Sequence, residues 1–239
     1  MRFPIFACMN KKHIRQHNAI TEARYEMSAL EKNIFYMLLA QVREDDIFGK
    51  EYVIHLNKLE EYIGKISAEE LGKAEDNLLS RVYVIPKDGG ELYVSLMTVV
   101  RYNDLERTLR IKISQKLLPY LIKLKAHYTE YQLDMALRLK SKYAKRMYEM
   151  LSQHKDVGIF AISIHDFKYR LYLLNKKGEE KYKVWAMFKK HILDIAQKEL
   201  VKHTDISFTY TAKKTGRKYT HLVFQIHDNT KQADESTAN

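Results

Sequence analysis

Apolar residues in the first half of the chain recur at helical spacing and later alternate as they do in strands. Ser28 and Glu31 form the pattern of a capping box, and the apolar positions after them predict a helix that ends near residue 44. We then expect a strand over 51–55, helices over 57–63 and 67–79, strands over 82–85 and 92–100 with a turn at 86–90, and a strand over 109–113. The predicted order is helix, strand, two helices and hairpin.

The second half repeats this order. We expect a long helix over 131–153, a strand over 159–162, a short helix from Ser163, a helix over 182–200, and strands over 206–211 and 219–226. The buried stripe of the 182–200 helix is predicted to hold Val184, Trp185, Phe188, Ile192 and Ile195. A helix, a strand, a turned pair of helices and a hairpin is the element order of a winged helix. The sequence therefore predicts an α+β fold of two tandem winged-helix domains.

The domain boundary is predicted near residue 125. Residues 1–125 would form an N-terminal winged-helix domain and residues 126–228 a C-terminal one. Residues 229–239 hold no large apolar side chain and are expected to be a disordered tail.

The charge of the chain is unevenly distributed between these domains. The chain has 41 Lys and Arg against 30 Asp and Glu, a net charge of +11. Residues 126–227 hold 20 basic and 10 acidic side chains, whereas residues 1–125 hold 20 and 17. Such an excess favours a polyanionic partner, either nucleic acid or an anionic membrane surface, bound mainly by the second half. The helix over 67–79 is acidic, so the first domain is expected to serve chiefly in protein association.

Several classes of protein are disfavoured. The single cysteine, Cys8, cannot form an intrachain disulfide, no apolar run is long enough to span a bilayer, and residues 1–9 are too short for a signal peptide, so a cytoplasmic protein is expected. No phosphate-binding loop or His-x-His pair is present, and His13 and His17 lack a third ligand. We therefore predict a protein without enzymatic activity, cofactor or metal.

Basic side chains cluster at three predicted elements of the second domain, where a winged helix would meet a DNA duplex. They lie on the long helix, at the start and first turns of the 182–200 helix, and at the hairpin tip. The candidate DNA-binding residues are Arg138, Lys142, Lys145, Arg146, Lys181, Tyr182, Lys183, Lys189, Lys190, Lys213, Lys214, Arg217 and Lys218. For the long helix alone, a solvated helix face explains the pattern equally well.

The 17 tyrosines raise the alternative of stacking on single-stranded bases. Most of them fall at positions expected to face a core or to lie on strands. They are more simply explained as packing residues, and we favour duplex DNA as the partner.

Four segments carry a resemblance to a known family. They are 18–28, 141–151, 188–205 and 213–224, which read NAITEARYEMS, SKYAKRMYEML, FKKHILDIAQKELVKHTD and KKTGRKYTHLVF. The chain resembles the initiator Rep proteins of theta-replicating plasmids with iterons, the family of the F-plasmid initiator, over about residues 18–227.

This resemblance implies a function with two states. Monomers would bind the direct repeats of a plasmid origin, and dimers formed through the N-terminal domain would bind an inverted repeat and repress the gene's own promoter. The host initiator and the replicative helicase would be further partners. Two alternatives remain, a purely regulatory winged-helix repressor and a DNA-nicking enzyme. The second is disfavoured by the absence of a nucleophile and metal constellation.

Overall fold

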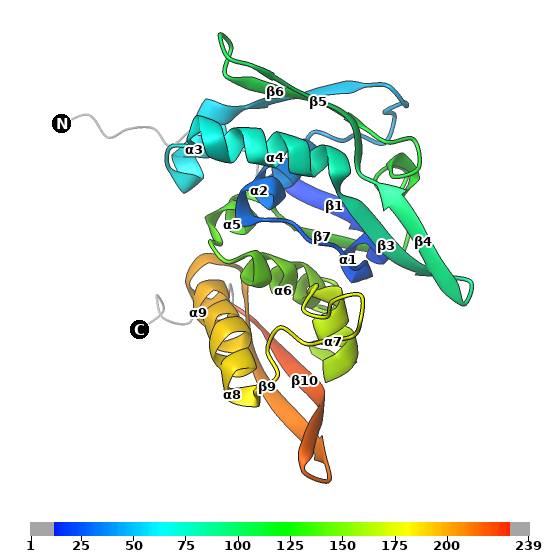
Figure 1. Ribbon diagram of the computed structural model, residues 1–239, viewed down its shortest axis with the longest axis vertical. Coiled ribbons are helices and arrows are strands. Elements are labelled where there is room, and N and C mark those ends of the chain that lie inside the picture. The colour runs from blue at the N-terminus through cyan, green and yellow to red at the C-terminus, as the bar shows by residue number, and fades with distance from the viewer. Residues whose placement is uncertain (1–11, 230–239) are drawn as a thin grey trace, which may run out of the picture.

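The computed structural model describes residues 12–229 and has two lobes, with one helix, α6, between them (Figure 1). Up to that helix the elements are β1 (His13–His17), α1 (Asn18–Glu22), α2 (Ala29–Leu39), β2 (Glu51–His55), α3 (Leu56–Ile63), α4 (Ala68–Ser80), β3 (Val82–Lys87), β4 (Gly90–Ser95), β5 (Met97–Asn103), β6 (Thr108–Ile113), the 3-10 helix η1 (Leu118–Tyr120), β7 (Tyr128–Gln132) and α5 (Leu133–Arg138). The remaining elements are α6 (Lys142–Ser152), β8 (Ile159–Ser163), α7 (Ile164–Arg170), α8 (Trp185–Phe188), the π-helical turn η2 (Lys189–Leu193), α9 (Asp194–His203), β9 (Ile206–Thr215) and β10 (Lys218–Asp228).

Each lobe contains a three-stranded antiparallel sheet with the same strand order. The order is β2-β6-β5 in the first lobe and β8-β10-β9 in the second, so in both the last strand of the hairpin lies in the middle. In both lobes two helical segments separate the first strand from the hairpin. The predicted α+β fold of two tandem winged helices is confirmed.

The wing of the first lobe differs from the hairpin that the sequence predicts. Residues 82–87 and 90–95 do pair across a tight turn, but they form a separate two-stranded sheet, β3-β4. The apolar run over 92–100 divides at the buried Leu96, whose backbone N–H donates to the carbonyl of Arg81. Beyond Leu96, β5 pairs with β6 and forms the wing.

The single helix predicted over 131–153 is wrong, because this segment forms the end of a strand and two helices. β7 pairs with β1 over residues 128–132, and α5 ends at Leu139, where ψ is 131°. Ser141 then caps α6, and the carboxylate of Glu199 accepts hydrogen bonds from the backbone just before it. Residues 128–138 therefore pack with the first lobe.

Most of the predicted helix starts are confirmed. Ser67 and Glu70 form a complete capping box at α4, and the Ser163 side chain caps α7. Ser28 likewise caps α2, but the carboxylate of Glu31 turns away from the cap and pairs with Arg81 at 2.8 Å. Glu31 therefore joins α2 to the end of α4 instead of completing a capping box.

The helix predicted over 182–200 begins at Trp185 and continues through the π-helical turn to His203. Phe188 and Ile192 are buried, as predicted. Val184 and Ile195 were expected in the same stripe but are 61% and 36% exposed. The buried positions after the π turn are instead Ala196 and Leu200, because a π turn holds more residues than an α turn and rotates the following side chains.

The core of the second lobe is aromatic. The ring of Phe224 on β10 lies 5.5 Å from the rings of Phe167 and Phe208 and 5.8 Å from that of Phe160. This cluster packs α7 against the β8-β10-β9 sheet. The predicted tail lies outside the described residues, except for Asn229, whose backbone N–H donates to the carbonyl of Asp205.

Candidate nucleic-acid interface

The helical segment 185–203 and the β9-β10 wing are joined by an aromatic stack at the first turn of the helix. The indole of Trp185 lies on the ring of Tyr219 with a centroid distance of 4.3 Å and an interplanar angle of 25°. The ammonium of Lys214 lies 4.6 Å from the centroid of the Tyr219 ring. The start of the helix and the part of the wing next to its tip are therefore held as one unit.

Exposed cations cover this unit. Lys183, Lys190, Lys213, Arg217 and Lys218 are exposed, and no carboxylate of the described residues lies within ion-pair distance of them. The wing projects away from the rest of the lobe, which leaves its tip accessible (Figure 1). The structure thus brings the 182–190 segment and the 213–218 tip together on one side of the second lobe.

The segment predicted as the start of the helix is instead an extended approach to it. Lys181, Tyr182 and Lys183 precede Trp185. The ring of Tyr182 stacks on that of His191 at 5.5 Å, so Tyr182 is partly buried against the helix, whereas the lysines on either side are exposed. The alternation places both ammonium groups at the solvent side of the helix start.

Lys189 and Lys190 lie in the π-helical turn but differ in charge compensation. Lys189 donates to the carboxylate of Asp194 at 2.7 Å, and this hydrogen bond raises the pKa of the lysine. Lys190 is exposed and has no such partner among the described residues. Of the two, Lys190 is therefore the better candidate for a phosphate or base contact.

The stripe predicted on the long helix does not exist as an exposed surface. Arg138 lies on α5 and pairs with Asp134 at 2.9 Å, and Lys142 at the start of α6 pairs with Glu26 at 3.2 Å. Lys145 and Arg146 are buried, with exposures of 0% and 5%. Assigning Lys145 and Arg146 to DNA binding was wrong, because their side chains point into the contact between α6 and the first lobe.

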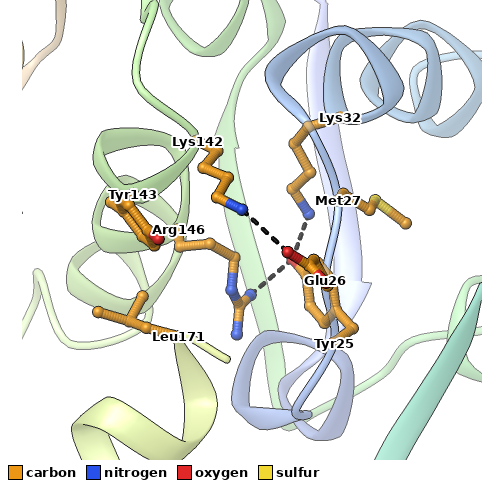
Figure 2. Close-up of a pocket in the computed structure, with 8 residues that line it drawn as sticks. All are labelled: Tyr25, Glu26, Met27, Lys32, Lys142, Tyr143, Arg146 and Leu171. Carbon is orange, nitrogen blue, oxygen red and sulfur yellow. Dashed lines mark hydrogen bonds and ion pairs between the residues drawn. The ribbon is translucent and has the colours of Figure 1, made fainter. Parts of the chain in front are cut away.

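These buried groups form a polar network around Glu149 on α6. Its carboxylate pairs with Lys32 of α2 at 2.6 Å and with Arg146 at 2.7 Å, and it accepts a hydrogen bond from Tyr25 at 3.0 Å. A small pocket lies beside this network. Figure 2 shows Lys32 and Arg146 converging on Tyr25 in its lining, next to the Lys142–Glu26 pair. Arg146 also donates to two carbonyls of the first lobe at 3.0 Å.

Two lysines in this region are held without full compensation. Burial lowers the pKa of Lys32 to about 8, although Glu149 opposes the shift. Burial also lowers the pKa of Lys145 to about 7. Its ammonium donates to the side-chain oxygen of Asn33 and to the carbonyl of Ala136, both at 2.6 Å, and forms no ion pair within the described residues. A buried charge is stable only while its partners stay in place. Removing one member of the network therefore leaves another buried charge uncompensated.

A second contact between the lobes was not predicted. The guanidinium of Arg24 lies between the rings of Tyr169 and Tyr172, at 4.7 and 4.5 Å, and donates to the carbonyl of Leu174 at 2.7 Å. Tyr169 also donates to Glu91 at the start of β4. The Arg24–Tyr169 pair joins residues far apart in sequence, so no local pattern signals it.

The helix of the first lobe that corresponds to the 185–203 segment is acidic rather than basic. This helix, α4, carries exposed Glu69, Glu70 and Asp76, and Lys73 is paired with Glu69. The acidic character predicted for this helix is confirmed.

The two histidines weighed as metal ligands, His13 and His17, lie on a strand rather than a helix. His13 contacts Glu130 at 2.9 Å, and the ring of His17 accepts the N–H of Ala19 and so caps α1. Within residues 12–229 no group of three potential ligand side chains is placed to hold a metal ion. No helix in the same range is long and apolar enough to cross a membrane.

Two winged helices, one of which presents an uncompensated cationic helix and wing, define a protein of the DNA-binding class. Comparison with protein families makes this specific. The model "Initiator Replication protein, WH1" matches residues 13–152 and "Initiator Rep protein, WH2" matches residues 163–226, so the chain belongs to the initiator replication protein family. The resemblance found in the sequence is confirmed.

Individual relatives agree with this assignment. The chain is 26% identical to the "PI protein" of Escherichia coli over 263 aligned residues, which cover 95% of this chain and 86% of the relative. It is 24% identical to the "Probable replication protein rep" of Bifidobacterium longum (strain NCC 2705), over 65% of this chain and 54% of that protein. The solved crystal structure of Pi initiator protein in complex with iteron DNA has the same fold, with a TM-score of 0.77, 24% identity, and coverage of 90% of this chain and 97% of that one.

Proposed function

We propose that this protein initiates plasmid replication by binding iteron repeats in duplex DNA, and that it does so without catalysing a reaction. The observation that carries the proposal is the helix–wing unit, where Lys183, Lys190 and the four cations of the wing tip are exposed around the Trp185–Tyr219 stack. None of these six has a carboxylate partner among the described residues. The similarity to an initiator whose solved complex contains iteron DNA supports the choice of ligand.

In this proposal the two parts of the unit have different tasks. The first turns of the helix enter the major groove, where side chains reach base edges, and the wing lies against the phosphate backbone. The Trp185–Tyr219 stack holds them at one distance, so phosphate contacts by the wing set the register in which the helix reads bases. Because the DNA it binds is a plasmid, we place the protein in the cytoplasm of a bacterial host. The host initiator and the replicative helicase would be further partners.

We assign dimerisation and weak DNA contact to the first domain, and the main DNA contact to the second. The exposed carboxylates of α4 would be repelled by phosphates, which supports a role of the first domain in protein association rather than in base reading. We extend the first domain beyond residue 125 to Ser152, since β7, α5 and α6 pack on it. A dimer formed in this way would bind an inverted repeat and repress the gene's own promoter.

A purely regulatory repressor would share this surface, and a replication assay separates the two functions. Deleting the gene from a minimal plasmid should abolish replication, and supplying the protein in trans should restore it. Retention of the plasmid without the gene would support the repressor instead.

Binding to a duplex that holds one repeat is expected to depend strongly on salt. The cations expected to contact phosphates are Lys190, Lys213, Lys214, Arg217 and Lys218, which are all exposed. Each would displace counterions, which gives a slope of log affinity against log salt of about −4.5. Fluorescence anisotropy measured from low to moderately high salt would give this slope. A flat response would exclude phosphate contacts by this surface and contradict the proposal.

Lys183 is expected to read sequence, whereas Lys214 and Arg217 are expected to contact phosphates. Lys183→Ala should cost roughly 1–3 kcal/mol on the cognate repeat and less on a scrambled duplex. Lys214→Ala and Arg217→Ala should weaken both duplexes alike and reduce the salt slope by about one unit each. Competition titrations on both duplexes measure these effects, with Lys202→Ala, an exposed lysine at the far end of the same helix, as the control. Equal losses on both duplexes would make Lys183 a phosphate anchor.

A further inference from the structure

The DNA-facing end of the helix also exposes apolar side chains. Val184 and Met187 are 61% and 46% exposed, and Ala186 between them is exposed as well. Val184 is the extended residue just before the helix and Met187 lies in its first turn, and both side chains are open to solvent. Trp185 and Phe188 instead turn inward, where they contact Tyr219 and the aromatic core.

This apolar patch is surrounded by charge of one sign. Lys183 precedes it, Lys190 follows it, and the wing with Lys214 and Arg217 is tied to the same turn through Tyr219. Packing within the protein does not account for Val184 and Met187, since both are largely open to solvent. Charge complementarity instead selects a polyanion as the occupant of this surface.

Among polyanions, duplex DNA presents an apolar group at a place that a helix can reach. The C5-methyl group of thymine projects into the major groove, where it is the distinguishing apolar feature of an A·T pair. We infer that Val184 and Met187 read thymine methyl groups of the repeat, which makes them specificity-determining residues beside the lysines. This inference rests on the proposed function and adds to it which chemical feature of the bases is read.

The test replaces thymine by deoxyuracil, which keeps base pairing and removes only the methyl group. A duplex with one direct repeat from beside the gene is prepared with each thymine replaced in turn, and the full-length protein is titrated on every duplex. At one or more positions we expect the affinity to fall about fourfold, the factor for one methyl group losing apolar contact. At the remaining thymines the affinity should be unchanged.

Alanine variants of Val184 and Met187 determine which side chain contacts which thymine methyl group. In Met187→Ala or Val184→Ala the thymine-to-deoxyuracil penalty at the corresponding position should fall below about twofold, because the apolar partner of the methyl group is gone. Val201→Ala, which shortens another exposed valine at the far end of the same helix, should leave every penalty as it is in the unmodified protein.

Three results would be decisive. Full affinity for every deoxyuracil duplex would overturn the inference while leaving the proposed function intact. An equal loss on thymine and deoxyuracil duplexes in both alanine variants would overturn it too, since the side chains would then act only by positioning the helix. No binding to the unmodified repeat would contradict the proposed function itself.

Discussion

Glu149→Gln is expected to lower the free energy of unfolding by about 3–5 kcal/mol, several times the loss expected from breaking an ion pair on the surface. Glu149 is the one carboxylate of the described residues that pairs with both Lys32 and Arg146, and all three side chains are buried. Burial would raise the pKa of Glu149, but Lys32 and Arg146 keep it below its ordinary value, so the group is ionised at neutral pH. Glutamine preserves the shape and leaves two buried cations without a counter-charge.

Urea unfolding at neutral pH measures this loss, and Glu69→Gln is the matched control. Glu69 pairs with Lys73 on the solvent side of α4, where the two side chains are 77% and 70% exposed, and such surface pairs contribute about 0–1 kcal/mol. The loss in Glu149→Gln should also be smaller at about pH 9, because Lys32 can then release its proton whereas Arg146 cannot. A loss equal to that of the control would show that the network does not hold α6 to the first lobe.

The helix–wing unit could be predicted from the sequence because its signals are local. Alternating apolar residues fix the two strands, and the tip between them is polar and basic, so Lys213, Lys214, Arg217 and Lys218 had to be exposed. The same reasoning placed Trp185 and Phe188 on the inner side of the helix. It placed Val184 and Ile195 there too. Val184 lies in the extended segment just before the helix, and no local pattern signals the π turn that changes the spacing before Ile195.

The wrong prediction that Lys145 and Arg146 lie on an exposed surface has a different cause. Apolar positions continue at helical spacing from Leu133 to Leu151, so the pattern hides the break between α5 and α6. The groups that surround Lys145 and Arg146 come from α2 and from residues 21–25, more than 100 positions earlier in the chain. A basic stripe looks the same in sequence whether it faces water or a distant set of hydrogen-bond acceptors.

The stability of the protein is expected to rise between about pH 7 and pH 9 through Lys145. Burial lowers the pKa of this lysine to about 7 in the folded state, against about 10.5 in the unfolded chain. Between these values the unfolded state binds more protons, so raising the pH favours the folded state. The contribution is complete above the unfolded pKa and is lost as the pH falls through the folded one.

The size of the effect follows from the same pKa values. Integrated from about pH 7 to pH 9, Lys145 should add about 2 kcal/mol to the free energy of unfolding, and Lys32, with a pKa of about 8, about 1 kcal/mol more. Carboxylates are ionised throughout this pH range, so they do not contribute to the change in stability. The range also avoids buried Tyr25, Tyr36 and Tyr131, whose pKa values burial raises and which would reduce stability only above about pH 10.

Lys145→Met tests this assignment, because methionine keeps the length of the side chain and removes the titrating group. Urea unfolding at several pH values should give a rise in stability that is smaller by about 2 kcal/mol over the window, whatever the absolute stability of the variant. Lys140→Met, at an exposed lysine just before α6, should leave the rise of the unmodified protein unchanged. If Lys145→Met kept the full rise, Lys145 would have to be ionised in the folded protein, and its buried ammonium would then be held by the oxygens of Asn33 and Ala136 alone.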